Sequence, residues 1–219
     1  MDEFEGIVIN SIDYKEKSKI VYLYTPYGHE SIRATKSKDY KSGFIGFTTT
    51  LNVVNYMKTK GEFPSLIEYN VKESFYDLTS SILVMKCVSM ILQIIKSIPN
   101  DTNHYRTYYF ILDILKELNN NNPKKVLCIF LIKMLYVFGV QPSLKKCSCC
   151  GRENNLFLCV NNGLSYCSNC YNNKSDLIDI WKEYYYDKKN IEEYSNTNFD
   201  ELLDEIKKYY NIFVNITLK

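Results

Sequence analysis

Histidine, proline and glycine are scarce in this chain, and the motifs of several enzyme classes are missing. The 219 residues include two histidines, five prolines and eight glycines. Neither His29 nor His104 belongs to an H-E-x-x-H pair, and no G-x-x-x-x-G-K-[ST], G-x-G-x-x-G or G-x-S-x-G sequence occurs. These absences remove the usual signatures of a zinc protease, a nucleotide-dependent enzyme and a serine hydrolase. The sequence therefore predicts a protein that is not an enzyme.

Signals for export and for membrane insertion are also missing. The first five residues are acidic where a signal peptide would be basic, and no long apolar segment follows them. The most hydrophobic stretch, residues 126–140, contains Lys133 and is shorter than the roughly 20 residues that span a bilayer, so it predicts a buried helix. We therefore expect a cytoplasmic protein with no membrane partner, whose eight cysteines stay reduced.

Positive charge is concentrated in two segments, although the net charge of the chain is only +2. Residues 31–61 hold six Lys or Arg and one acid, and residues 124–170 hold the same numbers. Two basic segments separated by acidic or near-neutral ones suggest contact with a polyanion such as nucleic acid. A run of like charge is also typical of a solvated surface, so the charge alone leaves both interpretations open.

The pattern of hydrophobic residues changes near residue 75. Before it, five short β-rich runs occur, at residues 6–9, 20–24, 29–34, 51–57 and 66–71. Residues 26–28 (PYG), between the second and third runs, are typical of a tight hairpin turn. Five short strands within about 75 residues favour a small barrel. The OB-fold is the leading candidate, and a half-open sheet sandwich is the alternative.

After residue 75 the spacing becomes helical. Residues 78–98, 108–118 and 126–140 are apolar on most sides, as expected of helices buried in a bundle. Apolar residues in the segment 199–213 recur at helical spacing, and Asn198 with Glu201 predicts a capping box at its start.

We therefore predict an α+β protein with three parts. An N-terminal OB-fold β-barrel occupies residues 1–75. A C-terminal α-helical domain occupies residues 76–146 and 171–219. A four-cysteine zinc module, residues 147–170, is inserted into the helical domain.

Four of the cysteines form two C-x-x-C pairs. Cys147 and Cys150 are followed, after sixteen residues, by Cys167 and Cys170. Each C-x-x-C turn aims two thiolates at one point, so two such turns supply the four tetrahedral sulfur ligands of a zinc site. We predict one structural Zn²⁺, because four protein ligands leave no open coordination position for chemistry. A redox dithiol and a set of free thiols are the alternatives.

The other four cysteines have different predicted roles. Cys149 could replace its neighbour as a ligand, although the spacing within the second pair favours Cys150. Cys159 lies between the two pairs and is expected to pack on the intervening hairpin. Cys87 and Cys128 lie in apolar helical segments and are expected in the core.

The order of these parts, an N-terminal barrel followed by a helical domain with an inserted four-cysteine module, resembles that of the RecO family of recombination mediators. The resemblance begins with residues 5–9 (EGIVI), 13–21 (DYKEKSKIV) and 23–28 (LYTPYG). Residues 130–142 resemble the family's helix that leads into the first cysteine pair, and residues 162–164 (NGL) resemble the approach to the second. The resemblance extends over nearly the whole chain.

The resemblance implies a function in DNA repair and recombination without covalent chemistry. RecO-like proteins bind single-stranded and double-stranded DNA, anneal complementary strands, and help to load a RecA-type recombinase at single-strand gaps. They act with RecR and with the single-stranded-DNA-binding protein. A groove for an acidic, hydrophobic-ended peptide tail is implied within the helical region, and the implied location is the cytoplasm, in association with the nucleoid.

The resemblance also gives the basic segments a role in binding phosphates. The predicted DNA contacts are Arg33, Lys36, Lys38, Lys41, Lys58, Lys60, Lys145, Lys146 and Arg152. The first four lie on the third strand and the loop after it, the next two near the end of the fourth strand, and the last three beside the first cysteine pair. The family often has Gly and Arg after the third strand, whereas this chain has lysines and Asp39. Lysine keeps the charge but not the bidentate contact of arginine, and a solubilising loop is the alternative.

Two other functions are compatible with the sequence. A zinc-ribbon transcription or adaptor protein would use the cysteine turns directly for recognition and would prefer a particular duplex site. A metalloenzyme would require a metal with an exchangeable water ligand, which the closed set of four cysteines disfavours.

Overall fold

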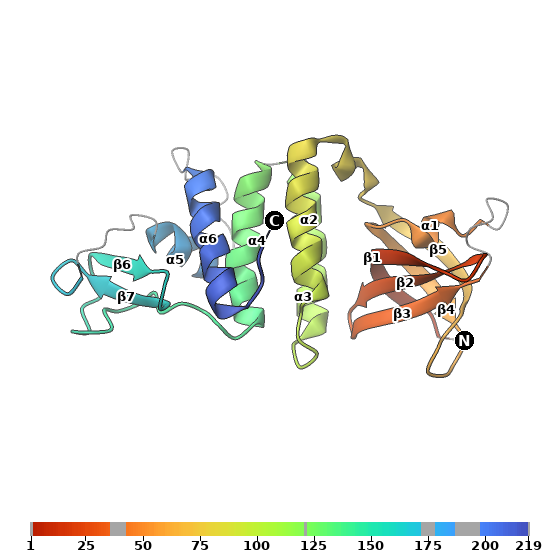
Figure 1. Cartoon of the computed structure of the whole chain (residues 1–219), viewed down its shortest axis with the longest axis horizontal. Helices are drawn as coiled ribbons and strands as arrows, with labels where there is room; N and C mark the ends of the chain where they lie inside the picture. Colours follow the sequence, from red (N-terminus) through yellow and green to blue (C-terminus); the bar gives the residue numbers. More distant parts are fainter. Residues whose placement is uncertain (1, 36–42, 121, 172–177, 187–197, 219) are drawn as a thin grey trace. The chain divides into compact units, whose positions relative to one another are not determined.

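The computed structural model describes residues 2–35, 43–120, 122–171, 178–186 and 198–218. Strands dominate the first third of the chain and helices most of the remainder (Figure 1). By their contacts, the residues divide into two compact units, Met1–Asn120 and Asn121–Lys219. Each unit has its own buried core.

The first unit contains a five-stranded antiparallel sheet. Its strands are β1 (Phe4–Tyr14), β2 (Ser18–Thr25), β3 (Gly28–Ala34), β4 (Asn52–Lys58) and β5 (Leu66–Ser74). They lie in the order β3-β2-β1-β4-β5. Each strand overlaps one of the five β-rich runs, so the five predicted strands are confirmed.

The turn between β2 and β3 is the tight hairpin predicted from residues 26–28. Thr25 and Gly28 form the last cross-strand pair before the turn. The Thr25 hydroxyl accepts a hydrogen bond from the backbone N–H of Tyr27 at 3.1 Å and donates one to the carbonyl of Gly28 at 2.9 Å. The side chain of Thr25 therefore holds the turn closed from inside.

The sheet does not close into a barrel. Closure requires β3 to pair with β5, but in the described part of the chain the two meet at one parallel bridge, between Arg33 and Ser65. There the backbone N–H of Arg33 donates to the carbonyl of Pro64 at 3.0 Å. The donor that would precede this bridge in a parallel ladder is the N–H of residue 64, which proline lacks. The α+β class and the antiparallel sheet are as predicted, whereas the closed barrel is not formed.

The core of the sheet lies between its curved strands and the short helix α1 (Ile45–Thr48). Its buried members are Val8, Val21, Leu23, Ile32, Ala34, Phe47, Val54, Tyr56 and Leu66. Phe47 of α1 is fully buried, and its ring lies 5.8 Å from that of Tyr56 and 5.4 Å from that of Tyr69. Helix α1 therefore covers one end of the sheet with the buried ring of Phe47.

The helical elements η2 (Tyr76–Ser80), α2 (Ile82–Lys96) and α3 (His104–Asn120) complete the first unit. The hydroxyl of Tyr108 donates to Glu5 of β1 at 3.0 Å, and Lys72 of β5 forms an ion pair with the same carboxylate. His29 of β3 hydrogen bonds the carbonyl of Ile95 at 2.8 Å. The change from strands to helices occurs near residue 75, as expected. These helices belong to the same compact unit as the sheet, while the predicted domain boundaries stay a prediction.

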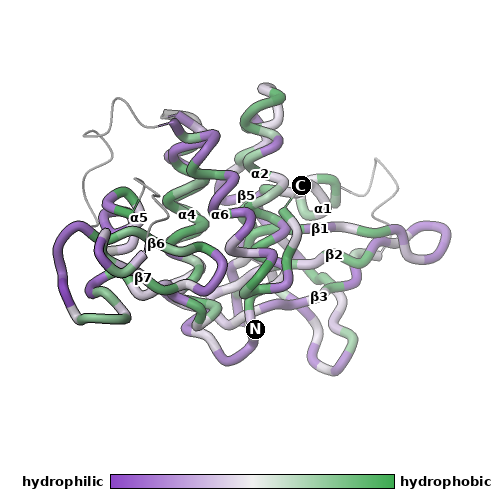
Figure 2. Tube along the Cα trace, turned by 60° about the vertical axis from the view of Figure 1, so that its left-hand side comes forward, coloured by the Kyte–Doolittle hydropathy of each residue, from purple (hydrophilic) through white to green (hydrophobic). Residues whose placement is uncertain are grey.

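The second unit is built around helix α4 (Pro123–Val137), which is buried along most of its length. Most of α4 is coloured as hydrophobic in Figure 2. Helix α6 (Phe199–Phe213) packs on it, and the hydroxyl of Tyr210 donates to the carbonyl of Leu131 at 2.7 Å. Asn198 accepts hydrogen bonds from the N–H groups of Asp200 and Glu201, which confirms the predicted N-cap of α6.

Helix α5 (Ile178–Tyr186) is not among the helices that the sequence predicts. Its anchor is Trp181, which is fully buried and lies 5.6 Å from the ring of Tyr209. Nine residues give a short periodic signal, and tertiary packing on α4 and α6 stabilises such a helix more than propensity does. Within the described ranges, the length and apolar character that a membrane-crossing helix needs are not found together in any helix.

Candidate metal centre and candidate nucleic-acid interface

The cysteine module is a hairpin with a cysteine turn at each side. Strands β6 (Leu156–Cys159) and β7 (Leu164–Cys167) pair antiparallel, with Leu156 opposite Cys167. Leu156 and Leu158 are buried and fix one face of the hairpin. The end of β7 therefore places Cys167 at a defined point beside the first cysteine pair.

Gly163 ties this hairpin to the rest of the second unit. It has φ 69° at the hairpin turn, and its carbonyl accepts the N–H of Ser143 at 2.8 Å. A Cβ at this position would lie 2.8 Å from the hydroxyl oxygen of Tyr209. Both the left-handed backbone and the close approach require glycine here.

Backbone hydrogen bonds shape both cysteine turns. In the first, the N–H of Cys147 donates to the carbonyl of Arg152 at 2.7 Å, and the N–H of Gly151 donates to the carbonyl of Cys147 at 2.9 Å. In the second, the N–H of Cys170 donates to the carbonyl of Cys167 at 2.9 Å. Each turn thereby directs its two side chains to the same side.

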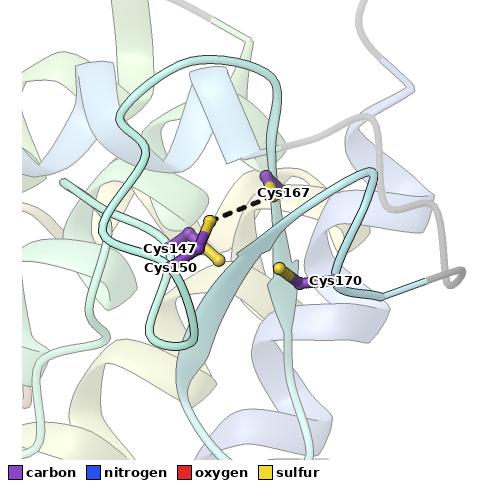
Figure 3. Close-up of side chains that lie close together, drawn as sticks. All are labelled: Cys147, Cys150, Cys167 and Cys170. Atoms are coloured by element: carbon purple, nitrogen blue, oxygen red, sulfur yellow. Dashed lines mark hydrogen bonds between the residues drawn. The ribbon is translucent and has the colours of Figure 1, made fainter.

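The four predicted ligands converge on one point (Figure 3). The sulfur atoms of Cys147, Cys150, Cys167 and Cys170 all lie within 4.8 Å of one another. The sulfurs of Cys150 and Cys167 are 3.6 Å apart. A tetrahedral zinc site with Zn–S bonds of roughly 2.3 Å has sulfurs about 3.8 Å apart. The sulfur positions therefore fit a closed four-sulfur site.

The four thiols alter one another's acidity through hydrogen bonds. Burial alone would raise the pKa of the Cys147 thiol. Hydrogen bonds from the backbone N–H groups of Cys150, Cys167 and Cys149 have the larger combined effect and lower the pKa to about 6. Hydrogen bonds to Cys167 and Cys150 raise the pKa of the Cys170 thiol well above its ordinary value. The Cys147 thiol therefore ionises readily, whereas the Cys170 thiol stays protonated and is hydrogen bonded to its neighbours. A divalent cation would displace these protons and bind all four sulfurs.

The remaining cysteines lie outside this cluster. Cys149 is exposed and is not among the four convergent sulfurs. Cys159 is half-buried, with its sulfur 3.6 Å from the hydroxyl of Tyr171. Cys87 and Cys128 are buried in α2 and α4, so their predicted place in the core is confirmed. Four close cysteines that could hold a metal ion are present, while zinc as the metal stays a prediction.

A groove of about 930 Å³ lies in the first unit, where the sheet fails to close. One wall includes Ser31 of β3, and the other includes Lys60 and Pro64 of the loop between β4 and β5. Phe4 and Lys58 also line it. We call this feature the β3–β5 groove.

Three of the predicted DNA contacts lie in or beside the β3–β5 groove. Arg33 is exposed on β3, and its Nε and Nη2 atoms donate to the Ser65 hydroxyl at 3.1 and 2.8 Å. A guanidinium has five N–H donors, so further donors are available to a phosphate. Lys60 is exposed and lines the groove. Lys58 also lines it, but its ammonium group forms an ion pair with Glu30.

The other predicted DNA contacts are placed elsewhere or not described. Lys36, Lys38 and Lys41 lie outside the described residues. Lys145, Lys146 and Arg152 are exposed in the second unit, on the segment that holds the first cysteine pair. A zinc ion with four thiolates keeps a negative net charge, so balancing that charge is a second role open to these three.

Sequence reasoning missed the groups that surround Lys58. Glu30 accepts hydrogen bonds from both Lys58 and the hydroxyl of Tyr56, and the Lys58 ammonium lies 4.3 Å from the centroid of the Phe4 ring. These residues come from three different strands, and Glu30 and Lys58 are 28 positions apart. No local spacing marks such a group.

Comparison with known proteins gives a consistent result. Residues 80–186 match the family model described as Recombination protein O C terminal. The chain is 28% identical over 163 residues to the DNA repair protein RecO of Listeria monocytogenes serotype 4b (strain CLIP80459), a match that covers 72% of this chain and 63% of that protein.

Two further relatives carry the same name. The chain is 28% identical over 175 residues to DNA repair protein RecO of Shouchella clausii, covering 76% of this chain and 67% of that protein. It is 25% identical over 188 residues to DNA repair protein RecO of Mycoplasma mycoides subsp. mycoides SC, covering 80% and 74%. Together with the resemblance in the strand and cysteine motifs, these matches show that the chain is similar to RecO proteins, most clearly over residues 80–186.

Proposed function

We propose that this protein is a DNA repair and recombination mediator that works by binding, without covalent chemistry. It binds single-stranded and double-stranded DNA and anneals complementary strands. With RecR, it helps to load a RecA-type recombinase at single-strand gaps that are coated with the single-stranded-DNA-binding protein. It acts in the cytoplasm, in association with the nucleoid.

The β3–β5 groove is the observation that carries the DNA-binding part of this proposal. It runs beside an exposed arginine, Arg33, and is lined by the exposed Lys60 and by the aromatic ring of Phe4. Cations that neutralise phosphates along a groove are one component of single-strand binding sites. Similarity to RecO proteins supports the same assignment, because these relatives are named DNA repair proteins.

We interpret the sheet as an OB-fold-like barrel with one open seam. Strand β1 pairs with both β2 and β4, and the single parallel bridge between β3 and β5 marks the position of the seam. OB-folds are partly open five-stranded barrels that bind oligonucleotides on the face of strands 2 and 3 and in the adjoining loops. The loop between β4 and β5, which carries Lys60, is one of these loops.

The four-cysteine cluster has a structural role in this proposal. One Zn²⁺ bound by Cys147, Cys150, Cys167 and Cys170 would join the first cysteine turn to the β6–β7 hairpin. Four thiolate ligands leave no position for substrate. The zinc would therefore order the segment of Lys145, Lys146 and Arg152 and take no part in a reaction.

The proposal is tested by replacing Arg33, Lys36, Lys38 and Lys41 with Ala and measuring affinity for fluorescent oligo-dT at several salt concentrations. If each side chain neutralises one phosphate of single-stranded DNA, the slope of log K against log salt becomes shallower by about 3. The measurement is fluorescence anisotropy. An unchanged slope and affinity would remove these residues from the site.

A matched control replaces four lysines that lie outside the two basic segments. Lys15, Lys17, Lys86 and Lys96 are exposed in the same unit, so their replacement with Ala changes the net charge equally. We expect little change in the salt slope from this control. Equal effects of the two quadruple variants would indicate a general charge effect and contradict a defined site.

The mediator role itself is tested by annealing and by partner binding. The protein should anneal complementary oligonucleotides that are coated with the cognate single-stranded-DNA-binding protein, and it should bind RecR at stoichiometric concentrations. Annealing independent of sequence supports the proposal, whereas footprints on a preferred duplex site would favour the zinc-ribbon transcription or adaptor function instead.

A further inference from the structure

Lys58 is the one cation of the β3–β5 groove whose charge is already neutralised by a described carboxylate. Its ammonium forms an ion pair with Glu30 and lies 4.3 Å from the centroid of the Phe4 ring. The side chains of Lys58 and Glu30 are 21% and 20% exposed, so the pair is largely withdrawn from water. A partly buried pair is screened by salt less than a surface pair is.

Glu30 is fixed in this position from a second side. The hydroxyl of Tyr56 donates to the other carboxylate oxygen of Glu30 at 2.5 Å. Tyr56 is almost fully buried, and burial together with the hydrogen bond to Glu30 raises the pKa of its hydroxyl far above the ordinary value. The hydroxyl therefore stays protonated and keeps donating. Two donors hold Glu30 beside Lys58.

The rest of the groove lining does not offset this carboxylate. Besides Glu30, the lining includes Asp2 and Glu62, against two lysines, Lys58 and Lys60. His29, which also lines the groove, is engaged with the carbonyl of Ile95. A phosphate that approached the Lys58 ammonium would come equally close to the Glu30 carboxylate, so attraction and repulsion would be of similar size.

We propose that Glu30 is an electrostatic brake on the groove: it neutralises Lys58, keeps phosphates away from this point, and so weakens the binding of single-stranded DNA. The inference rests on the proposed DNA-binding function and names a specificity-determining residue that opposes it. Phosphates are directed to Arg33 and Lys60 at the margin. Removal of the Glu30 charge turns Lys58 into an additional phosphate contact.

The test combines Glu30→Gln and Lys58→Gln in a double-mutant cycle. Glutamine keeps the size and much of the hydrogen bonding of Glu30 but removes its charge. With Glu30→Gln, we expect the slope of log K against log salt on oligo-dT to steepen by about 0.7, the contribution of one added phosphate contact. The loss of affinity between about 50 and about 200 mM salt then becomes roughly two- to threefold larger than for the wild-type protein.

The other arms separate this effect from simpler ones. Lys58→Gln alone leaves Glu30 without its ion-pair partner and should not strengthen binding to oligo-dT, whereas Lys58→Gln in the Glu30→Gln background should abolish the gain. Glu68→Gln is the matched control, because Glu68 is exposed on β5 outside the groove lining and its replacement changes the net charge equally. Far-ultraviolet circular dichroism and thermal midpoints verify that each variant is folded.

Each outcome decides the inference. A gain with Glu30→Gln that Glu68→Gln does not share, and that Lys58→Gln reverses, supports the brake. Equal effects of Glu30→Gln and Glu68→Gln, or a gain that persists when Lys58→Gln is added to Glu30→Gln, overturn it while DNA binding stands. If neither the wild-type protein nor Glu30→Gln binds oligo-dT at low salt, the proposed function fails and the brake fails with it.

Discussion

The cysteine module and the β3–β5 groove both gather ionisable groups, but they balance the charges of these groups in opposite ways. The module brings together four sulfurs that become anions of one sign, within 4.8 Å of one another. The groove pairs an anion with a cation, Glu30 with Lys58, and adds the neutral donor Tyr56. The first arrangement is incomplete without an added cation, whereas the second is already neutral. The four sulfurs of the module could thus hold a cation, whereas in the groove the charge of Lys58 is already balanced.

The largest expected effect in this comparison comes from removing one sulfur of the cysteine module. Structural zinc sites contribute apparent free energies of roughly 10–16 kcal/mol, which is similar to the whole stability of a domain, about 5–15 kcal/mol. We therefore expect Cys167→Ser to lose the metal and to unfold the cysteine module. Metal content by atomic absorption and urea unfolding followed by circular dichroism measure the two effects.

Cys149→Ser is the control for that experiment. Cys149 is exposed and lies outside the four convergent sulfurs, so its replacement should keep the metal content and the unfolding midpoint. A Cys167→Ser protein with full metal content and a wild-type midpoint would show that the cluster is a set of free thiols. Metal loss in Cys149→Ser would instead place Cys149 among the ligands.

A smaller effect is expected where the hairpin meets the rest of its unit. Gly163→Ala combines a left-handed backbone with a Cβ placed 2.8 Å from the Tyr209 hydroxyl. The two effects together should lower the free energy of unfolding by about 2–4 kcal/mol. Gly61→Ala is the matched control, because Gly61 also has positive φ, 119°, but an added Cβ there would meet no atom within 4 Å. Equal destabilisation by both substitutions would rule out the contact with Tyr209 as a cause.

The smallest effect concerns the groove and compares its two lysines. Lys60 is exposed, and none of the ion pairs among the described residues involves it, so Lys60→Gln should remove one phosphate contact. The salt slope on oligo-dT should become shallower by about 0.7. Lys58→Gln should change the slope by less than Lys60→Gln does, because Glu30 already neutralises the charge of Lys58. Anisotropy titrations of the two variants in parallel would contradict the distinction if both slopes changed alike.

Much of the fold is accessible from short-range patterns. The five strands, the turn at Pro26 and the N-cap at Asn198 are predicted from the sequence and confirmed, because each depends on residues a few positions apart. Helix α5 escapes prediction, because its burial depends on Trp181 packing against another helix. The first turn of α2 is expected to be buried, but Ile82 is 72% exposed. Hydropathy describes a residue's preference, whereas its neighbours decide its exposure.

The two candidate sites also differ in how far the sequence predicts them. The convergence of the four cysteines follows from two C-x-x-C turns, since each turn fixes its own pair of side chains. For the basic residues, the sequence supplies charge but not its partners. It ranks Lys58 with Lys60 as equivalent DNA contacts, and the structure separates them through Glu30.

The sequence by itself determined the resemblance to the RecO family, the succession of strands and helices, and the four cysteines that form one cluster, because all of these depend on local order along the chain. Only the tertiary structure decided that the seam between β3 and β5 stays open and that the charge of Lys58 is already balanced. Both features depend on strands that are far apart in sequence and become neighbours only in the folded sheet. An ion pair between residues 28 positions apart is a property of strand pairing and leaves no trace in local spacing.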